Sequence, residues 1–169
     1  MNAPSVFVLD ANVFINAARH YYAFDIAPAF WEQLVQLAAK GRIVSIDRVR
    51  DELLRGNDEL AEWAKKNFHG YFDETVDAAV LEVYRQIMIW AQQQSQFIEA
   101  AKADFACADN ADAWLAAYAK VKGYIVVTHE KFDPNIRRKI PIPNVCQAFG
   151  VSYVDTFEML RLLGVRLGS

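Results

Sequence analysis

The sequence predicts a three-layer α/β/α domain around a central, mostly parallel sheet of four to five strands. Short and largely apolar runs at residues 6–9, 42–46, 124–128 and 151–154 are typical of strands that are buried on both faces, as in parallel sheets. Segments with apolar residues at helical spacing lie between these runs. Because right-handed crossovers join such strands, successive strands should point the same way.

The first strand is the continuous apolar run at residues 6–9, which Asp10 ends. A short helix is expected over residues 13–19. Pro28 suits the first turn of a second helix, whose apolar residues recur at helical spacing until Gly41. Both helices should therefore cover the sheet before the chain enters its second strand.

A third helix is expected over residues 48–55, directly after the second strand. Asp47 can cap its N-terminus, and Gly56 can end it. Glu52 shares the inward face of this helix with apolar residues three positions before it and one position after it. Because the helix starts just past a strand end, Glu52 should lie near the carboxyl edge of the sheet.

A helical insert is expected at about residues 58–105. No strand is expected in it, and its three helices are predicted at residues 58–67, 74–94 and 97–105. The apolar stripe of the long middle helix begins at Val76. With 169 residues, 54% of them apolar, the chain can bury one sizeable core, so residues 1–169 are expected to form a single domain.

The second half of the chain returns to alternating strands and helices. Asp109 is a natural cap for the helix that follows it, and Gly123 should end that helix. Residues 132–143 look irregular. A short helix at residues 144–149 and a closing helix at residues 156–163, capped by its first residue, complete the expected fold.

The composition excludes several classes of protein. Eighteen basic and 21 acidic residues give a net charge of −3, so no global positive field indicates nucleic-acid binding. Cys107 and Cys146 lie far apart and have no paired histidines, so two free thiols are expected. Charges interrupt every apolar run before it could span a membrane, and no signal peptide is evident, so a soluble cytoplasmic protein is expected.

Asp10 is the first candidate functional residue. It falls at the carboxyl end of the first strand, with Asn12 close behind it, and this edge is where open α/β sheets place their sites. Either residue could instead merely cap the following helix. The functional interpretation gains weight only if other acids, distant in sequence, reach the same edge.

Three further acids are predicted there. Glu52 lies early in a helix that begins at a strand end, Asp112 lies on the inward stripe of a helix's first turn, and Glu130 follows the strand at residues 124–128. Each has a simpler interpretation, since Glu52 could pair with neighbouring arginines and Asp112 could share a capping role with Asp109. Their convergence favours a common site.

Four carboxylates crowded into one partly buried site repel one another, and such groups normally exist to hold hard divalent cations. Mg²⁺ or Mn²⁺ held by oxygen ligands suits phosphoryl chemistry, because a metal can activate water and neutralise charge on the phosphate. The acids Asp10, Glu52, Asp112 and Glu130 are therefore predicted to form a metal site.

The same residues carry a resemblance to a known family. The segments LDANVFI, VRDELLRG, ADNADAWLAAYA and VVTHE are similar, in order and spacing, to the successive motifs of the PIN-domain family of metal-dependent ribonucleases. The tail KIPIPNVCQAFGVSYVDTFEMLRLLG further resembles an uncharacterised PIN-like branch associated with toxin–antitoxin loci. The resemblance covers nearly the whole chain.

This resemblance implies a PIN-like fold, cleavage of single-stranded RNA at a site for Mg²⁺ or Mn²⁺, and inhibition by a cognate antitoxin protein. Asp10, Glu52, Asp112 and Glu130 match the family's four acids, and the residues implied to line the site are Asn12, Thr128 and Asp109. Two departures stand out. Glu130 stands where many members have Asp, and the insert at residues 58–105 is longer than in compact toxins.

RNA binding by an acidic protein requires local basic patches. The main candidate is the cluster Arg137, Arg138 and Lys139, with the pair Lys65 and Lys66 as a second. The long apolar helices of the insert would also permit a homodimer.

Two alternative functions remain open at this point. A strand-end acid such as Asp10 is also the nucleophile of phosphatases that form an aspartyl-phosphate, although the second acid of their motif is absent here. A non-catalytic PIN-like module that binds RNA or protein is the other. Intact acids at all four positions argue against it.

Overall fold

A computed structural model describes residues 4–168 and contains one five-stranded sheet in this range. All four strand pairings are parallel, and the strand order is β3-β2-β1-β4-β5. The strands are β1 (Phe7–Leu9), β2 (Ile43–Ile46), β3 (Phe72–Asp73), β4 (Ile125–Val127) and β5 (Tyr153–Val154). The predicted parallel sheet is therefore confirmed, and all strand carboxyl ends lie at one edge.

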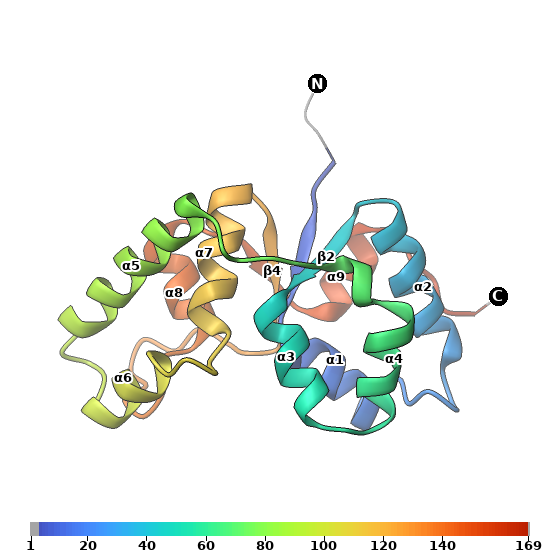
Figure 1. Cartoon of the computed structure of the whole chain (residues 1–169), viewed down its shortest axis with the longest axis horizontal. Helices are drawn as coiled ribbons and strands as arrows, with labels where there is room; N and C mark the ends of the chain where they lie inside the picture. Colours follow the sequence, from blue (N-terminus) through green and yellow to red (C-terminus); the bar gives the residue numbers. More distant parts are fainter. Residues whose placement is uncertain (1–3, 169) are drawn as a thin grey trace.

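Helices cover both faces of the sheet, which confirms the three-layer α/β/α architecture (Figure 1). One layer consists of α1 (Ala11–Asn16), α2 (Pro28–Ala39), α3 (Asp47–Arg55), α4 (Glu59–Asn67) and α9 (Thr156–Leu162). The other layer consists of α5 (Ala78–Gln93), α6 (Glu99–Phe105), α7 (Asp112–Lys122) and α8 (Ile142–Phe149). No helix among residues 4–168 is long and apolar enough to span a membrane.

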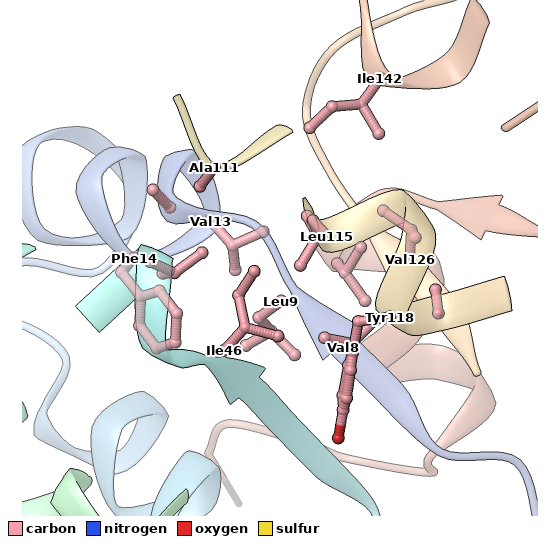
Figure 2. Packing of buried hydrophobic residues seen from close by; sticks show 14 of the residues in the cluster. Val8, Leu9, Val13, Phe14, Ile46, Ala111, Leu115, Tyr118, Val126 and Ile142 are labelled. Carbon is pink, nitrogen blue, oxygen red and sulfur yellow. The ribbon is translucent and has the colours of Figure 1, made fainter. Parts of the chain in front are cut away.

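The central strand is buried on both faces, as its apolar run predicts. Val8 and Leu9 point to opposite faces, and both are fully buried. Figure 2 shows side chains from α1, β2 and α7, among them Phe14, Ile46 and Leu115, gathered around β1. Each such burial contributes roughly 1.5–3 kcal/mol, so the carboxyl end of β1 is held within the hydrophobic core.

The prediction that the insert lacks a strand is wrong. Phe72 and Asp73 form β3, which pairs in parallel with β2 and adds an edge strand to the sheet. The hydroxyl of the buried Tyr118, in α7, donates a hydrogen bond to Asp73. A two-residue strand with one exposed member leaves no alternating or continuous apolar pattern, so the sequence carried no signal for it.

The helix predicted at residues 74–94 begins later than expected. Asp77 caps α5 by accepting hydrogen bonds from the backbone N–H groups of Ala79 and Val80. Val76 precedes this cap and is 76% exposed, so its predicted place on the inward stripe is wrong. The Asp77 cap therefore sets the start of α5, which the spacing of apolar residues had predicted too early.

Three predicted caps are also wrong. Asp47 is the first residue of α3, and its buried carboxylate binds the backbone N–H and hydroxyl of Thr75. Ala111 occupies the cap position of α7, and Oδ1 of Asn110, not a side-chain oxygen of Asp109, accepts from the N–H of Asp112. Asp155, and not Thr156, caps α9. For the last two helices an adjacent polar residue of equal capping ability was available, whereas the cap position of α3 is occupied by Ile46, whose side chain makes no capping bond.

Other boundaries differ by a few residues. The first helix begins at Ala11 and continues beyond α1 as a π-helical turn, Ala17–Tyr21. The short helix α8 begins two residues earlier than predicted, because a proline occupies its first turn. Gly123 ends α7 in the left-handed conformation, as predicted, with φ of 74°. Both cysteines are free, as expected, with Cys146 buried and Cys107 exposed.

Candidate metal centre

The strand order places a topological switch point at β1. The chain moves outward from β1 through β2 to β3, then crosses to β4 on the other side of β1 and continues to β5. Ligand sites of open parallel sheets form at such points, beyond the strand carboxyl ends. Asp10 follows β1 directly and Thr128 follows β4, so both lie at this crevice.

A hydrogen-bond network fixes these two strand ends together. The Thr128 hydroxyl donates to Oδ2 of Asp10 at 2.9 Å and accepts from Nδ2 of Asn12 at 3.3 Å. Oδ1 of Asn12 accepts from the backbone N–H of His129 at 3.1 Å. The Asp10 carboxylate makes no capping bond to α1. The simple capping interpretation of both residues therefore fails, and they instead position the switch point.

The four predicted acids converge on one cavity of about 370 Å³. Each comes from a different element, because Asp10 follows β1, Glu52 lies in α3, Asp112 starts α7 and Glu130 follows β4. Asn12 and Asp109 line the same cavity, as predicted, whereas Thr128 does not line it and instead donates a hydrogen bond to Asp10, which does. The cavity is also lined by residues that the sequence analysis did not select, including Asp104, Cys107 and Asn110.

The additional acid, Asp104, reaches the site by an unpredicted route. It lies in the last turn of α6, and the loop after α6 turns back so that the Asn110 side chain donates to the Asp104 carbonyl oxygen at 3.1 Å. This fold-back brings the end of the insert to the cavity wall. Nothing in the spacing of Asp104 marked it, because its position depends on the loop conformation.

A stacked group holds this loop and the two flanking helices. The Arg48 guanidinium lies 4.2 Å above the Trp114 ring, and Nη1 of Arg48 donates to the Ala108 carbonyl oxygen at 3.4 Å. Trp114 in turn stacks on Tyr84 at 3.8 Å between ring centroids. Arg48 is one of the neighbouring arginines with which Glu52 could have paired on the surface. Because its guanidinium lies over Trp114, it does not form that ion pair. The stack instead joins α3 to α7 across the site.

Three carboxylates of the cavity have raised pKa values. Burial, followed by the nearby Asp112 and Glu130, raises the pKa of Asp10 well above its usual range. Burial and the charge of Glu130 raise the pKa of Asp112 to about 7. Burial also raises the pKa of Glu52, although Arg55 and Lys139 oppose the change. The acids therefore lack sufficient positive charge around them.

Lys139 is the one basic side chain among the residues that line this cavity. Its Nζ lies 3.4 Å from Oε1 of Glu130, which also accepts from the N–H of Ile142 at 3.3 Å. Burial opposes the charge of Lys139, but Glu130 and Asp112 outweigh it and raise the pKa of the lysine. Of the three residues of the predicted basic cluster, all of which are exposed, only Lys139 lines the cavity. Arg137 and Arg138 do not line it.

The donor set suits a hard cation that keeps part of its hydration shell. Carboxylate and amide oxygens dominate the cavity wall, whose described residues include no histidine and a single cysteine, Cys107, so that it differs from the walls of zinc sites rich in thiolates and imidazoles. In the described part of the chain, no three His, Cys, Asp or Glu side chains are arranged to hold an ion directly. Mg²⁺ commonly binds through one or two carboxylates and several waters, so a roomy cavity with uncompensated acids fits it.

Solved structures with similar folds include VapBC2 from Rickettsia felis bound to a DNA fragment from their promoter. It has 15% identity and a TM-score of 0.55, with 89% of this chain and 98% of that chain covered. FitAcB from Neisseria gonorrhoeae has 20% identity and a TM-score of 0.54, with coverages of 88% and 96%. FitAB bound to the IR36 DNA fragment has the same identity and TM-score, with coverages of 89% and 94%.

At these identities the likeness shows the fold, which is the PIN-like fold expected from the sequence. No curated protein matches the chain. A family model described as a domain of unknown function, DUF4411, matches residues 7–167 and so includes every predicted acid and all five strands. The chain therefore belongs to the DUF4411 family, with a PIN-like fold.

Proposed function

We propose that this protein is a metal-dependent endoribonuclease that cleaves single-stranded RNA and is restrained by a partner protein, as in a toxin–antitoxin pair. The observation that carries the proposal is the convergence of Asp10, Glu52, Asp112 and Glu130 on one cavity at the switch point of the sheet. The raised pKa values of Asp10, Glu52 and Asp112 are caused mainly by burial, with nearby acids adding to the effect at Asp10 and Asp112, and they indicate carboxylates without a full counter-charge. Structural acids are normally paired instead.

A bound Mg²⁺ or Mn²⁺ would supply neutralisation of phosphate charge and a water of lowered pKa. Asp10, Glu52, Asp112 and Glu130 would hold the ion, one or two of them directly and the others through its bound waters, and Thr128 and Asn12 would keep the Asp10 carboxylate in place. Lys139, already at the cavity wall, would contact a non-bridging phosphate oxygen of the substrate. The ion and Lys139 would stabilise negative charge where phosphodiester hydrolysis develops it.

A basic loop beside the cavity supports a polyanionic substrate. Arg137 and Arg138 are exposed, and their loop is anchored to the insert, since the Arg137 carbonyl oxygen accepts from the N–H of Ile98 at 3.0 Å. The Gln96 side chain donates to the Ile136 carbonyl oxygen at 2.7 Å. The long insert thus supports the segment that carries the positive charge. Lys65 and Lys66, the alternative basic pair in α4, are less available for RNA binding, because the Nζ atoms of both lie within 4 Å of the Glu62 carboxylate.

A partner protein is proposed because the sequence resembles a branch associated with toxin–antitoxin loci, in which the toxin binds an antitoxin protein. Two of the similar structures, VapBC2 and FitAB, are named as bound to DNA. On this chain, an apolar groove of about 410 Å³ between α2 and α4, lined by Phe24, Trp31, Val35 and Trp63, offers a surface that an antitoxin could cover. A homodimer stays a prediction. Co-expression with the product of a neighbouring gene, followed by purification of a complex, tests the proposed partner.

Cleavage products test the chemistry directly. With Mn²⁺ or Mg²⁺ the protein should cut single-stranded RNA and leave 5′-phosphate and 3′-hydroxyl ends, because an activated water attacks phosphorus without help from the ribose 2′-hydroxyl. End labelling and mass spectrometry of the products provide the measurement. Cleavage that survives EDTA, or products with a 2′,3′-cyclic phosphate, would contradict the proposal.

The basic loop makes a separate prediction about affinity. Replacing Arg137 and Arg138 together by Ala should lower the slope of log affinity against log salt by about one for each phosphate contact that is lost. Binding to a cleavage-resistant RNA at several salt concentrations measures this slope. A matched control replaces Lys65 and Lys66, whose charges are already paired with Glu62. Equal slopes for the Arg137/Arg138 variant and the parent would place the RNA groove elsewhere.

A further inference from the structure

A second cavity, of about 690 Å³, adjoins the carboxylate cavity. Glu130 lines both, so the two spaces share a wall at the end of β4. Unlike the first cavity, this one is rich in aromatic side chains, which come from the π-helical turn, the loop after β4, β5 and α9: Tyr21, His129, Phe132, Tyr153 and Phe157. The function proposed above does not use it.

The aromatic rings form a supported platform. Tyr21 stacks on His129, with ring centroids 5.9 Å apart and planes inclined by 25°, and meets Phe157 edge-on at 5.6 Å. Nε2 of His129 is hydrogen-bonded to the buried hydroxyl of Thr156 at 2.8 Å, which fixes the ring. Even so, Tyr21 is 55% exposed and Phe132 is 40% exposed. Large apolar rings are thus displayed to solvent beside the candidate catalytic acids.

We propose that this aromatic cavity binds an unpaired nucleobase of the RNA strand whose phosphate lies in the carboxylate cavity. The inference rests on the proposed nuclease function and names the feature of the substrate that the chain would recognise. Unstacked bases of single-stranded nucleic acids pack on exposed aromatic rings, and this stacking tolerates any sequence because every base has a π face. A duplex, whose bases are already stacked, could not use the cavity.

Charge and position favour a base over other parts of a nucleic acid. Asp155, Glu158 and Glu130 line the cavity against the single cation Lys131, so a phosphate group would be repelled there. A neutral base would not be, and the carboxylate oxygens could accept hydrogen bonds from its amino groups. Because Glu130 borders both cavities, a strand that places a phosphate on one side brings an adjoining base to the other.

Binding of a fluorescent RNA tests the inference in a protein that does not cut. The Asp10→Asn protein is mixed with short single-stranded oligonucleotides that carry one 2-aminopurine, moved along the strand. Stacking on the platform should quench the fluorophore at one position. Tyr21→Ala in the same background should weaken binding roughly 5- to 150-fold and relieve the quenching, whereas Tyr21→Phe should retain both.

Two controls separate stacking from other effects. Ile26→Ala removes an 81% exposed side chain outside the cavity and should leave affinity unchanged. Phe132→Ala provides a second cavity variant in an irregular loop, in case Tyr21→Ala unfolds the platform. Because no charge is removed, both cavity variants should keep the salt slope of the parent, unlike Arg137→Ala with Arg138→Ala.

The outcomes distinguish this inference from the nuclease proposal. If Tyr21→Ala and Phe132→Ala both bind and quench like the parent while the wild type cuts RNA, the base subsite is wrong, and the cavity is better explained as a protein contact. If Tyr21 governs RNA binding but the wild type cuts no RNA with any divalent metal, the nuclease proposal fails while the base subsite stands.

Discussion

Replacing Asp10 by Asn is expected to abolish RNA cleavage while leaving the metal-free protein at least as stable as the wild type. Asp10 is 4% exposed, and burial, followed by the nearby Asp112 and Glu130, raises its pKa, so the change removes a carboxylate whose charge is disfavoured in the metal-free protein. Asn keeps an oxygen that can accept from Thr128. Loss of several kcal/mol of charge stabilisation should lower the cleavage rate by roughly a thousand-fold or more.

The structure offers a matched control for this variant. Asp47 is also a buried acid at the carboxyl end of a strand, but its carboxylate accepts hydrogen bonds from Arg48 N–H and from the N–H and hydroxyl of Thr75. Asp47→Asn should therefore destabilise the protein by about 1–3 kcal/mol, because the amide replaces one of the two accepting oxygens by an NH2 group that cannot accept from a buried donor. It lies outside the lining of the candidate centre and should not alter the response to metal.

Thermal unfolding of the wild type and both variants, each in EDTA and in excess Mn²⁺, provides the measurement. Mn²⁺ should raise the midpoint of the wild type and of Asp47→Asn by mass action on the folded state, and should raise that of Asp10→Asn far less. The opposite pattern would assign Asp10 a structural role. In that pattern Asp10→Asn is clearly destabilised in EDTA, yet responds to Mn²⁺ as the wild type does.

The sequence predicted the parts of the site that depend on strand ends and helical periodicity. Asp10 and Glu130 follow buried apolar runs, and Asp112 lies on an apolar stripe, so elementary geometry brought them to one edge. The position of Glu52 could be predicted from the single observation that its helix, α3, starts directly after β2. These signals are local in sequence, and a parallel sheet converts them into proximity in space.

The parts that were missed depend on contacts between distant segments. The strand β3 forms because its two residues pair with β2 at the edge of the sheet. The hydroxyl of Tyr118, in α7, donates a hydrogen bond to Asp73 of this strand. Lys139 reaches Glu130 because the loop before α8 is tied to the insert, and neither partner marks the other in the sequence. The caps of α7 and α9 were misassigned because two adjacent residues could serve, and only the final backbone path selects between them.

The stability of the metal-free protein is expected to fall as the pH rises from about 4 to about 7. The folded state raises the pKa of Asp112 from an ordinary value of 3.8 to about 7, and also raises that of Asp10. The folded protein therefore binds more protons than the unfolded chain in this range, so the stabilising contribution is complete below the unfolded pKa and is lost as the pH passes the folded pKa. The loss should be on the order of 1–4 kcal/mol.

Denaturant unfolding in EDTA at a series of pH values measures this decline, and two comparisons locate its origin. Asp112→Asn should flatten the profile, because a neutral amide does not titrate, whereas Asp77→Asn changes an exposed cap residue of α5 and should leave the slope unchanged. Excess Mn²⁺ should reverse the trend above about pH 7, since the ion binds deprotonated carboxylates and competes with protons for them. A wild-type protein that gains stability between pH 4 and 7 in EDTA would show that these acids are paired in the folded state, and would remove the electrostatic basis of the proposed metal site.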